Sequence, residues 1–251
     1  DEQKKLDQIW QETLNTAAIP PGLTDDFVKD EWAQVVQAKG VSTASAYASA
    51  PRSGRGTPLD RKKRIALWAV FEAFAARMIA DGLTEPDTAY REASGLIEKE
   101  QGLLPYAAVI VDETQDMGEQ ALRLIRAISQ SGGRNHQNAL FLVGDAHQRI
   151  YARKASLAAC GIEVRGRSHR LRLNYRTTDL IRRWAVGVLE GVAVDDLNDS
   201  VESLRGYRSL IKGVAPEFVA YPTRSEEIAG LVAWVDKVRA DDPKLTDTAI
   251  L

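Results

Sequence analysis

Hydrophobic residues in the first hundred positions recur at intervals of three and four, which is the spacing of one face of an α-helix. Three stretches follow this spacing: Leu6, Ile9 and Trp10 before the Pro20-Pro21-Gly22 break; Phe27, Trp32, Val35 and Val36 within 25–39; and Leu67, Phe71, Phe74 and Met78 before Gly82. Asp60 is placed to cap the third helix, and a further helix is expected at 90–99. Up to about residue 103 the pattern therefore predicts only helices and loops.

Two short apolar runs, 107–111 and 139–143, replace the helical pattern and are typical of buried parallel strands. Between them, Asp116 and Glu119 have the spacing of a capping box, and the residues around them predict a helix with one apolar side. The apolar positions of that helix are Met117, Ala121, Leu124, Ile125 and Ile128. A strand, a helix and a second strand form a right-handed crossover. The two strands are therefore expected to lie parallel, with their carboxyl ends at the same edge.

The pattern after residue 160 predicts shorter elements on both sides of an irregular connection at 191–213. These are strands at 162–164, 171–173 and 217–221 and a helix at 178–189. A last helix opens on a capping box of Thr223 and Glu226. Its apolar residues, expected to face inward, are Ile228, Leu231, Val232, Val235 and Val238. Residues 248–251 have the pattern of the start of one more strand.

Carboxylate and amide side chains follow the two predicted strands. Asp112 and Glu113 come directly after the first apolar run, and Asp145 and Gln148 come after the second. Ligands of open α/β sheets bind beyond the carboxyl ends of the strands, and there one carboxylate can hold Mg²⁺ while its neighbour orients an attacking water. An Asp-Glu pair after an apolar run is, taken alone, more often a pair of exposed turn carboxylates that carries no chemistry, so the pair by itself decides little.

Three polar clusters in order give the chain a family resemblance. The sequences VDETQD at 111–116, VGDAHQRIY at 143–151 and LNYRTT at 173–178 resemble motifs II, III and IV of superfamily 1 DNA helicases of the UvrD/Rep/PcrA type. The resemblance implies an α/β fold, a partial P-loop NTPase (RecA-like) parallel sheet with a helical subdomain before it. It places a 1B-like helical subdomain at 1–103, the C-terminal half of motor domain 1A at 104–172 and the start of a second RecA-like domain, 2A, at 173–251.

The same resemblance implies a role for five residues. Asp112 would hold the Mg²⁺ of Mg-ATP, and Glu113 would activate the hydrolytic water. Gln148 would sense the γ-phosphate, Arg176 would reach that phosphate from the second motor domain, and Tyr175 would stack on adenine. Phosphoryl transfer needs such parts, because a metal, a positioned water and a cation together offset the charge on the transferred group. The alternatives are a surface position for Gln148 and a core position for Tyr175.

Gln115 and Asp145 are less direct candidates for the chemistry. Both belong to the motif segments, and their side chains are suited to brace the loop through hydrogen bonds. We therefore expect them to support the residues that contact the nucleotide.

Charge is distributed unevenly along a chain whose net charge is only -2. The segment 52–64 carries six basic residues against one acidic residue, and 149–176 carries eight against one. Local clusters of cations suit a polyanion such as DNA, although an exposed basic face without a ligand explains them equally well. Where the family commonly has a tryptophan after the motif III tyrosine, this chain has cations. The candidate DNA contacts are Tyr151, Arg153, Lys154, Arg52 and Arg55.

A phosphate-binding loop is missing from the sequence, since GK[ST] occurs nowhere and the SGRGTP stretch at 53–58 lacks the required lysine and spacing. Helicase motifs V and VI are missing as well. The resemblance implies an ATP-dependent DNA helicase that moves 3′ to 5′ on single strands at a duplex junction. Because these motifs are missing, we expect the chain to be a piece of such a helicase and to hydrolyse almost no ATP alone. The alternative is a non-catalytic DNA-binding or protein-interaction module that has kept motor residues.

The remaining composition favours a cytoplasmic protein without membrane contact. Cys160, the single cysteine, cannot form an internal disulfide, and no signal-like or spanning apolar segment occurs. Cys160 is expected to be a passive residue of the core or of a loop.

Overall fold

A computed structural model describes residues 2–52, 55–100, 104–131, 138–148, 155–189, 191–192, 194 and 206–242. The chain divides into two compact units, which we describe separately. The first contains the described residues up to His169, and the second contains Arg170 to Val192 together with 206–242.

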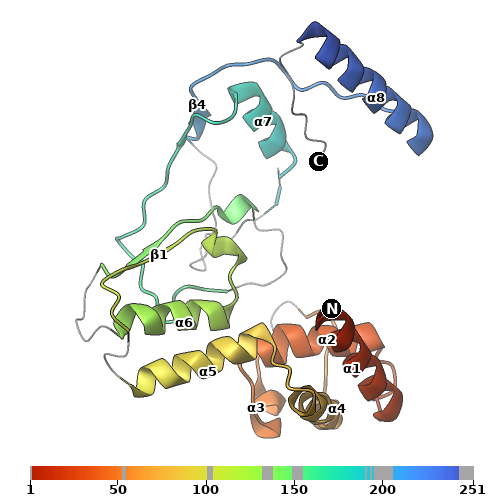
Figure 1. Ribbon diagram of the computed structural model, residues 1–251, viewed down its shortest axis with the longest axis vertical. Coiled ribbons are helices and arrows are strands. Elements are labelled where there is room, and N and C mark those ends of the chain that lie inside the picture. Colours follow the sequence, from red (N-terminus) through yellow and green to blue (C-terminus); the bar gives the residue numbers. More distant parts are fainter. Residues whose placement is uncertain are drawn as a thin grey trace. The chain divides into compact units, whose positions relative to one another are not determined.

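The first unit begins with a group of helices (Figure 1). They are α1 (Glu2–Thr16), α2 (Asp25–Glu31), a π-helix η1 (Trp32–Gln37), α3 (Ala44–Ser49), α4 (Arg61–Ala80) and α5 (Pro86–Lys99). The three predicted amphipathic stretches are thus confirmed as helical, and Asp60 caps α4 by accepting a hydrogen bond from the Lys63 amide at 2.8 Å. The predicted helix at 90–99 is the later part of α5.

Aromatic side chains form the centre of this helical core. Trp10 of α1 stacks on Phe74 of α4 with ring centroids 3.7 Å apart, and Trp32 meets the same Phe74 edge-on at 5.2 Å. The wider turn of η1 leaves Trp32, Val35 and Val36 all buried. Large rings that interdigitate in this way bury much apolar area, so the core holds α1, η1 and α4 together.

A buried carboxylate ties α2 to the loop that precedes α4. Glu31 has no exposed surface, and its two oxygens accept hydrogen bonds from Arg52 at 2.5 and 2.8 Å, from Arg55 at 3.2 Å and from Tyr47 at 2.9 Å. Burial by itself would raise the pKa of the Glu31 carboxyl, but the hydrogen bonds from Arg52 and Tyr47 and the charges of both arginines outweigh it and hold that pKa below its ordinary value. Burial and the neighbouring Glu31 charge raise the pKa of Tyr47.

This arrangement corrects one prediction from the sequence. Arg52 and Arg55 were expected to contact DNA, but their side chains are only 6% and 12% exposed and both guanidinium groups are bound to Glu31. A buried carboxylate needs such partners, because an unpaired buried charge is strongly destabilising. The two arginines therefore serve the fold of the helical part.

The helical part continues into a β-α-β segment made of β1 (Val109–Val111), α6 (Glu119–Gln130) and β2 (Leu140–Leu142). The two strands pair in parallel, with Ile110 opposite Phe141, as the crossover predicted. The strands are shorter than the apolar runs, yet backbone bonds flank them on both sides: Val109 donates to Ala139 at 2.7 Å, and Val143 donates to Val111 at 2.8 Å. Helix α6 lies between α5 and the strand pair (Figure 1).

The predicted capping box of α6 is wrong. Gly118 precedes the helix without a side-chain cap, and Asp116 belongs to a short 3₁₀ helix, η2 (Thr114–Asp116). Glu119, whose side chain is buried, instead forms an ion pair with the partly exposed Lys39, and Gln120 donates to the Ala38 carbonyl at 2.9 Å. A tertiary contact with the end of the preceding helices has thus taken the Glu119 side chain that the local pattern assigned to a cap.

The second unit contains β3 (Leu173–Asn174), α7 (Asp179–Gly187), β4 (Arg208–Ser209) and α8 (Arg224–Asp241), with β3 and β4 parallel. Thr223 caps α8 by accepting from the Glu226 amide at 3.3 Å, as predicted. The inward orientation predicted for the apolar residues of α8 is wrong for Ile228 and Val232, which are more than half exposed. Leu231, Val235 and Val238 are partly buried, and no residue of α8 is fully buried by the described structure.

Two other predicted strands are not formed. Residues 217–221 have no regular secondary structure and no paired strand among the described residues. In the first unit, 162–164 is also irregular, and Ile162 packs into a small core with Leu122 and Cys160. Cys160 is therefore a buried core residue, and burial raises the pKa of its thiol. The strand predicted at 248–251 lies outside the described residues.

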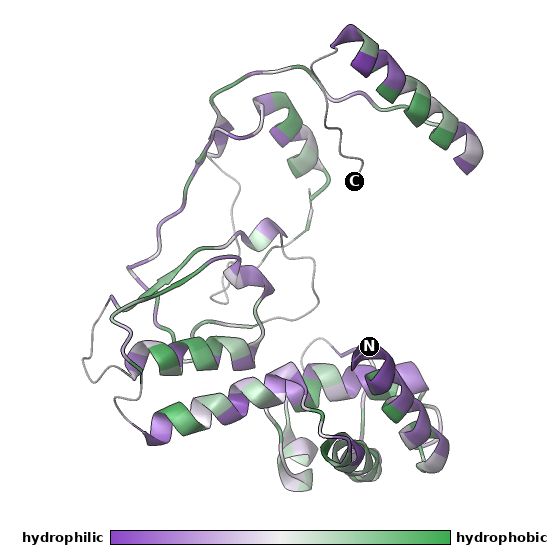
Figure 2. Cartoon of the chain, viewed as in Figure 1, coloured by the Kyte–Doolittle hydropathy of each residue, from purple (hydrophilic) through white to green (hydrophobic). Residues whose placement is uncertain are grey.

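Hydrophilic residues interrupt the apolar ones on α5, α6 and α8 (Figure 2). Helix α4 is the longest, and it opens on four consecutive basic residues. Within the described ranges, no helix combines the length and the apolar character needed to cross a bilayer.

The Glu31 cluster gives a testable stability prediction. Because its pKa is lower in the folded chain, Glu31 contributes stability above its unfolded value of about 4.5, and this contribution is lost as the pH falls through the folded value. Glu31→Gln should lower the free energy of unfolding at pH 7 by about 3 kcal/mol, since it leaves two arginines short of a charged partner. Urea unfolding, monitored by tryptophan fluorescence, measures this change in the free energy of unfolding.

The difference between Glu31→Gln and wild type should shrink below pH 4.5. Glu92→Gln, on an exposed position of α5, is the matched control and should change little at either pH. Equal stability of Glu31→Gln and wild type at pH 7 would contradict the assignment.

Candidate functional site

Two loops leave the β1–β2 pair at the same edge. Asp112 and Glu113 follow β1 directly, and 143–148 follows β2, ending in a 3₁₀ helix η3 (Ala146–Gln148). The Thr114 amide donates to the Val143 carbonyl at 3.0 Å, which continues the pairing beyond the strands. The structure thus brings the polar side chains of motifs II and III to one place, as the parallel topology predicted.

Glu113 occupies an unusual backbone conformation. Its φ and ψ are 52° and 39°, in the left-handed region, and it is the only described residue other than glycine with a positive φ. This conformation costs a residue with a Cβ roughly 1–2 kcal/mol. Strain of this kind persists where the surroundings enforce it and is concentrated at functional sites. The turn exposes the Glu113 carboxylate at the strand end.

Asp112 fits a position in which a carboxylate shares a magnesium ion with water and phosphate. Its side chain is exposed, and its Oδ1 accepts the Glu113 amide at 2.8 Å, which leaves Oδ2 without a bonded partner among the described residues. No cluster of three metal-binding side chains occurs in the described part of the chain. Mg²⁺ commonly keeps several waters and takes only one or two carboxylates beside the nucleotide phosphates, so one exposed Asp is sufficient for that mode.

Gln115 joins the two loops. Its side chain is buried, its Nε2 donates to Glu113 Oε2 at 2.6 Å, and its Oε1 accepts from the Asp145 amide at 2.9 Å. The expectation that Gln115 braces the loop through hydrogen bonds is therefore confirmed. Both ends of one amide are used, so the carboxylate of motif II and the backbone of motif III are held at a fixed separation.

Asp145 organises the turn that carries Gln148. Its Oδ1 accepts from the His147 amide at 3.0 Å, and its Oδ2 accepts from Gln148 Nε2 at 2.9 Å. Asp145 thus braces the loop, as expected. Gln148 is exposed, and its amide oxygen accepts no hydrogen bond within the described residues, so the side chain is available at the rim of the site.

Two residues at this edge were not singled out from the sequence. Gly144 lies so close to Gln115 that a Cβ built on it would be 2.7 Å from Gln115 Oε1. Thr114 is buried, and its hydroxyl lacks a hydrogen-bond partner in the described structure. The glycine that opens the run GDAHQ was the available signal for a close approach of two segments.

Tyr175 and Arg176 belong to the second unit, where they follow β3. Asn174 accepts from the amides of Arg176 and Thr177 at 2.9 and 3.0 Å, which fixes the turn in which they lie. Tyr175 is 79% exposed, so it is not a core residue of its unit, which was the alternative to stacking on adenine. Their roles toward the nucleotide remain predictions, as do the DNA contacts of Tyr151, Arg153 and Lys154, which lie outside the described residues.

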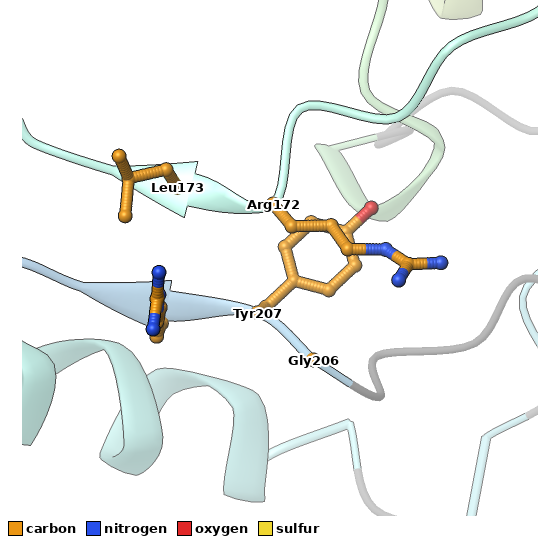
Figure 3. Close-up of a pocket in the computed structure, with 5 residues that line it drawn as sticks. Arg172, Leu173, Gly206 and Tyr207 are labelled. Atoms are coloured by element: carbon orange, nitrogen blue, oxygen red, sulfur yellow. The ribbon is translucent and has the colours of Figure 1, made fainter.

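A shallow hollow in the second unit, of about 580 Å³, lies beside the β3–β4 pair (Figure 3). It is lined by Arg172, Leu173, Gly206, Tyr207 and Arg208. None of the predicted catalytic residues lines it, so we do not assign the nucleotide to this hollow.

Comparisons with known proteins match the part of the chain that contains this site. A family model described as an AAA domain matches residues 58–154, a range that includes both strand-end loops of the first unit. Over 123 residues the chain is 31% identical to DNA helicase IV of Escherichia coli (strain K12). This alignment covers 49% of the chain and 17% of that relative, so the chain spans only a small part of the relative's length.

The strained backbone of Glu113 gives a prediction that is independent of activity. Glu113→Gly should be more stable than Glu113→Ala by about 1 kcal/mol, because only the glycine adopts a positive φ without a steric cost. Both variants lose the same bond to Gln115, so their difference reports the backbone alone. At Asp112, where φ is not positive, the order should reverse, with Ala the more stable by about 0.5 kcal/mol. Chemical denaturation of the four variants measures both differences.

Proposed function

We propose, for a chain that belongs with the superfamily 1 helicases of the UvrD/Rep/PcrA type, that its first unit holds the Mg²⁺-binding and water-activating residues of an ATP-driven DNA helicase. One observation carries the proposal. The carboxylates of motif II and the polar turn of motif III lie at one edge of a parallel strand pair, and Gln115 hydrogen-bonds the two loops together. Acidic and amide side chains converging at the carboxyl ends of parallel strands are what a nucleotide site of this fold requires.

Asp112 would hold Mg²⁺ through its outward oxygen, directly or through water. The bound ion would supply neutralisation of the charge on the β- and γ-phosphates. The Glu113 amide occupies Asp112 Oδ1, so Oδ2 is the oxygen left for the ion. The choice of Asp112, rather than its neighbour, as the ligand rests on the resemblance of the motif II segment to the helicases.

Glu113 would accept the proton of the attacking water. Gln115 occupies one carboxylate oxygen of Glu113 and so leaves the other for the water. Gln148, at the rim of the same edge, has an amide that can bond both a phosphate oxygen and the water. A base held in a fixed orientation contributes more to the rate than a mobile one, because less ordering remains to be done in the transition state.

The resemblance also gives Arg176 and Tyr175, which follow β3, roles toward the nucleotide. The guanidinium group of Arg176 matches the oxygens of a γ-phosphate and would stabilise the charge that develops on transfer. Tyr175 has an exposed ring, which is the condition for stacking on adenine.

DNA would be bound mainly through phosphate contacts of Arg153 and Lys154, with Tyr151 beside them. Arg52 and Arg55 are left out, because Glu31 occupies their guanidinium groups, and Arg64 donates to the carbonyls of Tyr47, Ala48 and Ala50. The substrate would be a single strand at a duplex junction, with movement 3′ to 5′ in the cytoplasm. The sequence lacks GK[ST], so the 251 residues alone should not turn over ATP.

The test of this function uses the full-length protein that contains the chain. Glu113→Gln should bind Mg-ATP with near-normal affinity and lose turnover by about 10²- to 10⁴-fold, because an amide does not accept the water's proton. Single-turnover hydrolysis and nucleotide binding measure the two effects separately. Glu92→Gln, on the exposed face of α5, makes the same chemical change elsewhere and should hydrolyse ATP normally. A full-length wild type with no DNA-dependent ATPase would favour the non-catalytic module instead.

The DNA contacts have a separate signature. Replacing Arg153 and Lys154 by Ala in the full-length protein should weaken single-strand binding equally for all sequences. It should also flatten the log-log salt dependence by about 0.7 per lost phosphate contact. Lys4 and Lys5, both exposed on α1, provide a control that removes the same charge. If both double variants give the wild-type slope, Arg153 and Lys154 form only an exposed basic face.

A further inference from the structure

We infer that Gln115 is a positioning residue that makes the orientation of Glu113 depend on the loop Gly144–Gln148. This inference rests on the proposed function, in which Glu113 is the base. The role inferred for Gln115 is to orient the Glu113 carboxylate, in addition to stabilising the loop. The amide would transmit the position of the phosphate-sensing loop to the carboxylate that activates the water.

The hydrogen bonds form one continuous chain across the site. Gln148 donates to the Asp145 carboxylate at 2.9 Å, the Asp145 amide donates to Gln115 Oε1 at 2.9 Å, and Gln115 Nε2 donates to Glu113 Oε2 at 2.6 Å. Each link is short enough to be a strong hydrogen bond. The residue expected to sense the γ-phosphate is therefore connected to the proposed base through two intermediates.

Burial makes the middle link stiff. Gln115 is 2% exposed, so water does not replace its partners, and breaking either bond leaves a buried polar group unpaired. The amide is also planar, so a displacement of the Asp145 backbone moves Oε1 and Nε2 together. A shift of the 144–148 loop is thus passed to the Glu113 carboxylate rather than absorbed between them.

Gly144 is the second, independent observation. A Cβ at this position would lie 2.7 Å from Gln115 Oε1 and 3.2 Å from the Gln115 amide nitrogen. The loop therefore approaches the amide as closely as its backbone allows. An added methyl group would displace the end of the Gln115 side chain most, and the backbone amides of Thr114 and Gln115 by a few tenths of an ångström, while the glutamine is retained.

The strained turn at Glu113 explains why the positioning is needed. Its left-handed backbone is unfavourable for a glutamate and is held by surrounding contacts. The bond from Gln115 is the one side-chain contact that the described structure gives to the Glu113 carboxylate. Without it, the exposed carboxylate would sample several rotamers, and misplacing a reacting group by about 1 Å can cost roughly 10²-fold in rate.

The experiment compares two variants of the full-length protein with matched controls. Gln115→Leu removes both hydrogen bonds at similar side-chain volume, and Gly144→Ala displaces the amide while leaving it present. Gln120→Leu makes the same chemical change at a buried glutamine five residues on, whose amide bonds the Ala38 carbonyl. Gly95→Ala adds a methyl group in α5, where no atom lies within 4 Å.

Gln115→Leu and Gly144→Ala should each lower the single-turnover rate of ATP hydrolysis by about 10- to 100-fold. Their dissociation constants for Mg-ATP should stay within about 3-fold of wild type, because the phosphate-binding groups are untouched. Gln120→Leu should lower the thermal stability without this loss of rate, and Gly95→Ala should change neither.

The outcomes separate this inference from the proposed function. If wild type hydrolyses ATP and Glu113→Gln does not, but both test variants keep the wild-type rate, the positioning role is wrong and the function stands. A rate loss in Gln120→Leu equal to that in Gln115→Leu would reduce Gln115 to a structural residue. Should Gln115→Leu fail to fold, Gly144→Ala decides alone. If Glu113→Gln keeps full turnover, the proposed base is wrong, whatever the Gln115 variants do.

Discussion

The parallel pairing of β1 and β2 is the constraint on which the candidate site depends. Parallel strands need a crossover between them, and here the crossover is α6, so both strands end at the same edge. A shift in register would move the polar loops apart and turn the side chains of both strands to the opposite face. Bonds from Val143 to Val111 and from Thr114 to Val143 prevent such a shift.

Helix α6 also connects this edge with the helical part of the first unit. It packs along α5, and its first residues reach back through the Glu119–Lys39 ion pair and the bond from Gln120 to Ala38. The segment between β1 and α6 is therefore fixed at both ends, at the strand and at the helices. This fixation gives a physical reason for the left-handed turn at Glu113, because a chain segment held at both ends has little freedom to relax the strain.

Carboxylates have different uses in the helical part and at the site. Glu31 is fully buried and paired with two arginines, and it serves to connect α2 with the 52–57 loop. Asp112 and Glu113 are exposed at the strand ends, and each has one oxygen bonded and one oxygen open. The first arrangement saturates a carboxylate, whereas the second leaves room for a ligand. The same residue types therefore point to structure in one place and to chemistry in the other.

The sequence by itself determined the helices of the first hundred residues, because the spacing of apolar residues is a local property of each segment. It also determined the β-α-β crossover, and a parallel strand pair brings the residues that follow both strands to one edge, namely Asp112, Glu113, Asp145 and Gln148. Only the tertiary structure decided which side chains are free. The sequence pattern indicated a basic surface at Arg52 and Arg55, but both arginines pair with Glu31. It indicated a cap at Glu119, which pairs with Lys39, and an inward orientation for Ile228 and Val232 of α8, which are exposed within their unit. The partners of Arg52, Arg55 and Glu119 lie more than twenty residues away along the chain or on another element, and a pattern within one segment carries no information about them. The sequence predicted that Gln115 braces the loop, but that its amide joins Glu113 to the Asp145 backbone was decided by the tertiary structure for the same reason.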